Sequence, residues 1–243
     1  MPNSIPLVDE VPLAISINSI NYSVVLVSPF DLEDFIVGYL RSESVITFNH
    51  DIHDIEFNEQ NDALLANVTI ANRCLVNFNA QQRQLKGTTG CGLCGTQALK
   101  FAFPKLTSLP EAPCFDLTLI EQTKSQLRQW QTNGAESGAL HAAFWINSQG
   151  AIIACREDIG RHNALDKLLG YLLRQNVNTK GGAVLVTSRC SVELVQKNII
   201  AGINNLISLA SPSRLAAKMA SQHNLHLIHV PKKDPAYLIG GIS

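Results

Sequence analysis

The carboxyl-terminal half of this 243-residue chain alternates between strand-like and helix-like segments, and this order limits the folds open to it. Apolar runs typical of buried strands lie at 140–146, 151–155, 183–186 and 226–230. Helical spacing of apolar residues follows at 162–175, at 192–209 and from Ser211 onward. Strands separated by helices of this length favour a layered sheet with some parallel pairing. We therefore expect an α/β domain over 114–243, which begins with a helix capped by Asp116.

The first 86 residues predict a smaller, strand-rich part with one well-marked helix. Apolar residues at one-face spacing place that helix at 32–40, after a start signal at Ser28 and Asp31. The expected strands are 12–18, 22–27, 54–57, 63–70 and 73–78. The polar, glutamine-rich stretch after them leads into glycines and threonines, so we expect a mobile loop and connector over 87–113.

Composition argues against nucleic acid-binding, membrane-spanning and disulfide-rich proteins. A net charge of −1 and a pI near 6.6 give no reason to expect a nucleic acid partner. No apolar run is long enough to span a bilayer, and the first ten residues lack the layout of a signal peptide, so we expect a cytoplasmic protein. Six cysteines with one close pair do not resemble a disulfide framework.

That close pair, Cys91 and Cys94, carries the clearest chemical signal in the chain. Glycines surround both thiols and keep them accessible to large partners. A thiolate can take a terminal sulfur as a persulfide, and a neighbouring thiol can release it by attack on that sulfur. Three alternatives compete with this interpretation: half of a zinc site, with His141 or His162 as a further ligand, a dithiol redox pair, or two incidental cysteines.

Two further segments place arginines where a predicted strand gives way to a helix. The first contains Arg156, Asp158, Gly160, Arg161, His162 and Asn163, and the second contains Ser188 and Arg189. Ligands collect at such strand ends, and helix amino termini offer unpaired N–H groups to anions. We expect Asp166 to orient His162 from one turn further along the helix. The alternative is a pair of capped helices with solvated salt bridges.

The chain resembles the FdhD family of formate dehydrogenase accessory proteins. The resemblance rests on the two arginine-bearing segments together with the Gly90–Gly95 loop, the His141-Ala142-Ala143 strand and Ser211-Pro212-Ser213. The resemblance implies a cytidine-deaminase-like α/β domain, usually dimeric, with a smaller N-terminal part. It implies a sulfurtransferase that takes sulfur from a cysteine desulfurase. The sulfur passes to the molybdenum bis(molybdopterin guanine dinucleotide) cofactor, which is bound as a substrate, and no permanent cofactor or metal is expected.

The same resemblance assigns roles to residues of this chain. Cys91 becomes the persulfide carrier and Cys94 its partner, while the two arginine-bearing segments hold the guanine nucleotide phosphates. The other expected contacts to the cofactor come from Ser211 and from the region at the end of the last strand. The family commonly has a Gly-Phe-x-Arg-like segment in that region, and this chain has His229, Val230, Pro231, Lys232 and Lys233.

Two other functions compete with sulfur transfer. The deaminase zinc signature has a His-x-Glu ahead of its cysteine pair, whereas His141 follows the pair and lacks that glutamate, so deamination is not expected. The rival from another class is a non-catalytic nucleotide- or cofactor-binding protein, with a structural metal at the cysteine pair.

Overall fold

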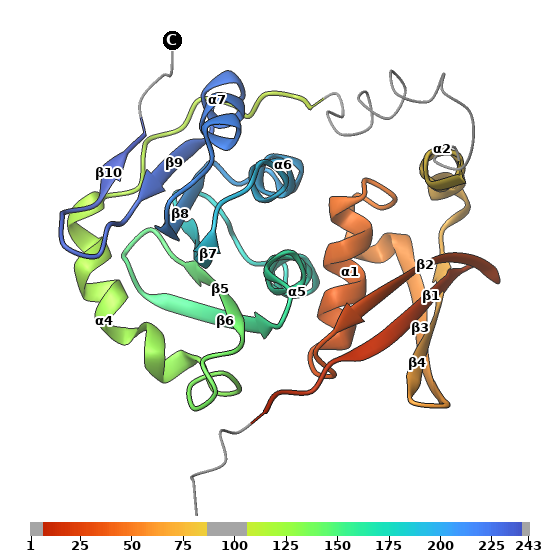
Figure 1. The fold of residues 1–243 in the computed structure, drawn as a ribbon. Coiled ribbons are helices and arrows are strands. Elements are labelled where there is room, and N and C mark those ends of the chain that lie inside the picture. The colour runs from red at the N-terminus through yellow and green to blue at the C-terminus, as the bar shows by residue number, and fades with distance from the viewer. Residues whose placement is uncertain (1–6, 87–105, 240–243) are drawn as a thin grey trace, which may run out of the picture.

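The computed structural model describes residues 7–86 and 106–239. Within them the chain forms two β-sheets in a mixed α/β arrangement (Figure 1), which confirms the expected fold class. The finer likeness to cytidine deaminases and the boundaries at 86 and 113 stay predictions. In the described part, no helix is both long enough and apolar enough to cross a membrane.

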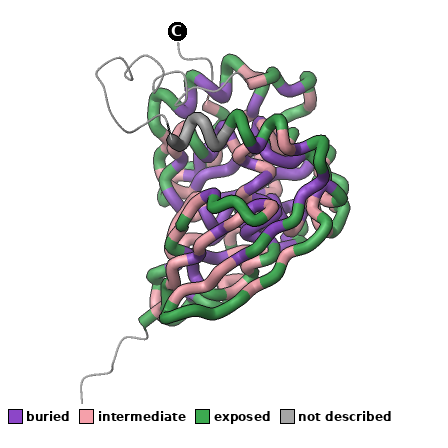
Figure 2. Tube along the Cα trace, turned by 90° about the vertical axis from the view of Figure 1, so that its right-hand side faces the viewer, coloured by how far each residue is buried: buried purple, intermediate pink, exposed green. Residues whose placement is uncertain are grey.

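The first sheet has four strands in the order β2-β1-β4-β3. Its strands are β1 (Val11–Ile17), β2 (Ile20–Val27), β3 (Ile52–Gln60) and β4 (Ala63–Ile70). Alternation of apolar and polar residues buries one face of β1, where Leu13, Ile15 and Ile17 pack beneath helix α1 (Leu32–Ser42). The outer face, which is turned to the viewer in Figure 2, is largely exposed or half-buried.

The expected strand at 73–78 is wrong, because the chain is helical there. A short 3-10 turn, η2 (Asn72–Cys74), leads into α2 (Leu75–Lys86). In a strand, residues 74, 76 and 78 would share one face. Instead Cys74 and Phe78 are buried while Val76 is 77% exposed, which is the spacing of one helical turn.

The second sheet has six strands in the order β10-β9-β8-β7-β5-β6. They are β5 (His141–Ile146), β6 (Ile152–Asp158), β7 (Ala183–Arg189), β8 (Asn205–Ala210), β9 (His226–His229) and β10 (Tyr237–Leu238). Strands β7, β8 and β9 are parallel, while β5 is antiparallel to both β6 and β7. The expected mixture of parallel and antiparallel pairing is confirmed.

Helices cover both faces of this sheet (Figure 1). On one face lie α5 (Arg161–Arg174), α6 (Val192–Ala201) and α7 (Arg214–Gln222). On the other face lies α4 (Ile120–Trp130), preceded by η3 (Leu117–Leu119), where Asp116 accepts a hydrogen bond from the Thr118 amide as expected of a cap. Each face has its own apolar core.

The expected helix at 192–209 is also wrong in its second half. Helix α6 ends at Ala201, Gly202 adopts a left-handed φ of 80°, and the chain returns as strand β8. Glycine is the residue that this backbone conformation favours, and it ends the helix. The following helix is capped by Ser213, whose hydroxyl accepts from the Ala216 amide, and not by Ser211.

The two sheets are joined through a close crossing of α1 on α5. Gly38 and Gly170 meet at this crossing, and a Cβ atom built on Gly38 would lie 1.7 Å from the Asp166 carbonyl oxygen. Ion pairs flank it, with Arg156 and Arg174 both bound to the buried Asp34. The first part is therefore packed firmly against the helix that carries the arginine segment.

Candidate functional site

Strand direction brings the predicted site residues to one edge of the second sheet. Because β6 and β7 are both antiparallel to β5, they run in the same direction as β8 and β9. Their carboxyl ends therefore meet where β5 begins, and His141 pairs directly with Asp158. We call this the carboxyl edge, formed by His141 and residues 158–162, 187–191, 210–213 and 229–230.

Three helices begin at the carboxyl edge. The first turns of α5, α6 and α7 follow β6, β7 and β8 directly, at Arg161, Val192 and Arg214. The first amides of a helix have no partner within the helix, and the helix dipole places partial positive charge there. Three such ends at one edge favour a ligand with several negative charges.

Two arginines add full positive charge at the same place. Burial lowers the pKa of His141, and the charges of Arg161 and Arg189 lower it further, so both guanidinium groups act on one imidazole. Arg189 is exposed. The Nε atom of Arg161 is buried and has no hydrogen-bond partner among the described residues. The carboxyl edge therefore has two converging cations with hydrogen-bonding capacity to spare.

His162 links the two arginine-bearing segments. Its Nε2 atom lies 3.3 Å from the Ser191 hydroxyl and 3.2 Å from a Glu193 carboxylate oxygen. The Ser191 hydroxyl donates to the same carboxylate at 2.7 Å. Burial and Arg161 lower the pKa of His162, while Glu193 opposes that shift. The arrangement can hold the imidazole in one position and pass a proton at Nε2.

The expected pairing of His162 with Asp166 is wrong. Asp166 is buried where α5 meets α1 and α6, and there it accepts from the Ser42 hydroxyl at 2.6 Å and binds Lys197 at 2.8 Å. Glu193 takes the orienting place instead. Sequence reasoning did not assign it a role, although its position two residues after the cap Ser191 was a usable signal.

Arg156 and Asp158 have partners inside the protein. The Arg156 guanidinium binds Asp34 at 2.7 Å and lies over the Tyr171 ring. Asp158 is fully buried and pairs with Lys167 at 2.8 Å. Asp158 also accepts from the Gly160 amide and from Asn163, so it holds the loop that presents Arg161. Further along this segment, Gly160, Arg161 and His162 are partly exposed at the carboxyl edge.

The remaining predicted contacts lie at the same edge with differing exposure. Ser211, Lys232 and Lys233 are exposed and Pro231 is half-buried, whereas Ser188, His229 and Val230 are buried. His229 and Val230 are fixed to strand β8, since the Ser208 carbonyl accepts from the Val230 amide and lies 3.1 Å from the His229 ring. Cys91 and Cys94 lie outside the described residues, and within the described residues no group of three His, Cys, Asp or Glu side chains could hold a metal ion.

Comparison with known proteins places the chain in a family. The sequence model of the FdhD/NarQ family matches residues 8–238. The chain belongs to the FdhD/NarQ family. Relatives named "Sulfur carrier protein FdhD" include one from Bordetella petrii, 36% identical over 90% of this chain and 79% of the relative. Another, from Cupriavidus necator, is 37% identical over 90% of this chain and 76% of the relative.

A solved structure has the same fold. It is described as a putative formate dehydrogenase accessory protein from Desulfotalea psychrophila, with a TM-score of 0.72. The two share 23% of their residues, over 96% of this chain and 87% of that one. The shared fold therefore extends over both sheets described here.

Proposed function

We propose that this chain is a sulfur carrier that serves formate dehydrogenase as a sulfurtransferase. It takes persulfide sulfur from a cysteine desulfurase and delivers it to the molybdenum bis(molybdopterin guanine dinucleotide) cofactor, its bound substrate. Membership of the FdhD/NarQ family and relatives named sulfur carriers support the role. A homodimer without a permanent cofactor belongs to the proposal through the family resemblance. A cytoplasmic location belongs to it through the sequence pattern described above.

The carboxyl edge is the observation that carries the choice of substrate. A dinucleotide cofactor bears several phosphates, and here two arginines converge with three helix amino termini. Guanidinium groups bind phosphate oxygens through paired, charge-assisted hydrogen bonds. In this proposal Arg161 and Arg189 bind the phosphates of the guanine nucleotide, and His162, which follows Arg161 in the chain, contacts Ser191 of the second segment.

The two cysteines can release the carried sulfur without an outside reductant. The Cys91 thiolate attacks the terminal sulfur of the donor persulfide, and the donor cysteine leaves as a thiolate. Cys94 then attacks the Cys91 sulfur, which forms a Cys91–Cys94 disulfide and releases the carried sulfur as hydrosulfide. The two electrons that reduce this sulfur come from the two cysteines, and a cellular thiol reduces the disulfide before the next cycle.

Incubation with a cysteine desulfurase and cysteine is expected to add one or more sulfur atoms to the intact protein. Intact-mass spectrometry with and without reductant measures the gain. Cys91→Ala should abolish it, because the attacking thiolate is gone. Cys114→Ala is the matched control, since Cys114 is an exposed free thiol in the described part of the chain, and it should load like wild type.

A wild-type protein that gains no sulfur under conditions that load a known acceptor contradicts the carrier role. Equal loading of the Cys91→Ala and Cys114→Ala variants would assign the sulfur to some other cysteine. Stoichiometric zinc in the purified protein, lost on Cys94→Ala together with thermal stability, would favour the rival function of a cofactor-binding protein with a structural metal.

Arg189→Ala is expected to weaken the binding of GDP, the probe for the nucleotide end of the cofactor. Loss of a charge-assisted contact to phosphate should raise the Kd about ten- to a hundredfold, as measured by isothermal titration calorimetry. Arg128→Gln on the exposed face of α4 is the control and should bind GDP like wild type. Unchanged affinity in Arg189→Ala would remove the carboxyl edge from the proposed phosphate site.

A further inference from the structure

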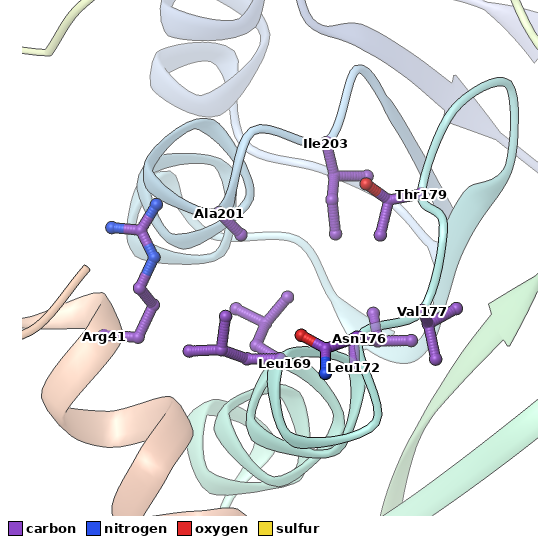
Figure 3. Close-up of a pocket in the computed structure, with 9 residues that line it drawn as sticks. Arg41, Leu169, Leu172, Asn176, Val177, Thr179, Ala201 and Ile203 are labelled. Carbon is purple, nitrogen blue, oxygen red and sulfur yellow. The ribbon is translucent and has the colours of Figure 1, made fainter. Parts of the chain in front are cut away.

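A small hollow lies far along the helices from the carboxyl edge. It is lined by the last turn of α1, the end of α5 with the loop that follows it, and the end of α6 (Figure 3). Its volume is about 280 Å³, which suits a small molecule. The hollow therefore stands at the opposite ends of α5 and α6 from the proposed phosphate site.

The floor of this hollow is apolar. Leu169 and Leu172 of α5 form it, and Ile203 lies above them, all three nearly inaccessible to solvent. Thr179 and Asn176 stand at one side, and Arg41 stands at the other (Figure 3). A hydrocarbon surface with polar groups at its two sides is typical of sites for small amphipathic ligands.

Arg41 is the unusual member of the lining. Its side chain is half-buried, and within the described part of the chain it makes no ion pair, unlike the half-buried Arg156 and Arg174. Burial lowers the pKa of Arg41, and the opposing charge of Asp51 is already bound by Arg73 at 2.6 Å. The guanidinium is thus partly removed from water without a close counter-charge.

A structural role at the helix end does not explain this position. Arg41 lies in the last turn of α1, where a cation complements the helix dipole. A cation that serves only this role can stay in water near the helix end and does not need to be half-buried. The closing carbonyls are already bonded, for example Leu40 to the Val45 amide and Leu172 to the Val177 amide. A counter-anion from outside the chain would satisfy the guanidinium.

We propose that this hollow binds a small organic carboxylate with an apolar body, which pairs its carboxylate with Arg41 and lays its hydrocarbon part on Leu169 and Leu172. A hydroxyl or amide at the far end of such a ligand meets Thr179 and Asn176, which have no side-chain partner within the described residues. The site is separate from the proposed sulfur-carrier chemistry and does not depend on it.

Ligand-observed NMR titration with three probes tests the site on the full chain. Hexanoate combines both features, formate supplies the carboxylate without the hydrocarbon, and hexylammonium supplies the hydrocarbon with the opposite charge. We expect saturable hexanoate binding that is at least about tenfold tighter than binding of either other probe. Arg41→Gln should weaken hexanoate binding by about tenfold or more, while Arg128→Gln leaves it unchanged.

A second variant fills the hollow without touching its charge. Ala201→Leu places a larger side chain in the lining and should abolish hexanoate binding while Arg41 remains. Circular dichroism melts check that both variants fold. The proposal is overturned if hexanoate does not bind wild type, if hexylammonium binds equally well, or if a folded Arg41→Gln protein keeps full affinity.

Discussion

Gly38→Ala is expected to lower the free energy of unfolding by roughly 3–5 kcal/mol, measured by urea denaturation. The new Cβ would lie 1.7 Å from the Asp166 carbonyl oxygen and 2.8 Å from the Gly170 amide nitrogen. These are backbone atoms of α5, which cannot rotate away as a side chain can. Helix α1 must therefore move off α5, and the ion pairs of Asp34 with Arg156 and Arg174 must stretch with it.

Gly170→Ala should have a comparable effect, because its Cβ would lie 1.8 Å from the Asp34 carbonyl oxygen on the same crossing. The matched control is Gly138→Ala. No atom lies within 4 Å of that Cβ, so the substitution costs only about 1 kcal/mol for the left-handed φ of 65°. A Gly38→Ala protein within about 1 kcal/mol of wild type would mean that α1 and α5 cross at a greater distance.

The helix crossing shows what the sequence could not reveal. A glycine inside a helical pattern lowers helix propensity, and Gly38 and Gly170 each look like local defects when taken singly. The two glycines allow α1 and α5 to cross closely, although these helices are separated by more than a hundred residues in the chain. No periodicity within either helix carries that information.

Local patterns succeeded where one signal dominated and failed where two competed. The helix at 32–40 and the strands at 12–18 and 22–27 could be predicted because the spacing of their apolar residues fits one period only. The run from Ile199 to Leu209 is apolar enough for either a helix or a strand, and the break at Gly202 was the decisive residue. The six residues from Arg73 to Phe78 fit the period of a strand and that of a helix. Phe78 is buried in the core of the first sheet, and the segment is helical.

The candidate site was predictable in part from the rule that ligands gather at strand ends. That rule located Arg161, His162 and Arg189 at one edge, and strand order brings them together. It could not separate these from Arg156 and Asp158, which are bound inside the protein by Asp34 of α1 and by Lys167 of α5. Packing of the folded chain, which the local sequence pattern does not show, decides whether a charged residue faces a ligand or the protein interior.

Lys167→Met is expected to lower the free energy of unfolding by about 3–5 kcal/mol in a thermal or urea melt. The Lys167 ammonium is fully buried, 2.8 Å from Asp158 and 3.0 Å from the Ser28 carbonyl oxygen, and lies over the Phe30 ring. Methionine fills a similar volume without charge. It would leave the buried Asp158 carboxylate without its cation, and that loss is the source of the cost.

The double variant Lys167→Met with Asp158→Asn distinguishes the cost of an unpaired buried charge from the cost of altered packing. Because it removes both buried charges, it should recover about 2 kcal/mol or more of the loss in Lys167→Met. The amide oxygen of the asparagine would keep an acceptor for the Gly160 amide, which now donates to one Asp158 oxygen at 2.8 Å. The Ser28 amide donates to the other oxygen at 3.0 Å and would lose that acceptor, so the recovery is expected to be partial. Equal instability of the single and double variants would show instead that the lysine acts through packing and its bond to the Ser28 carbonyl.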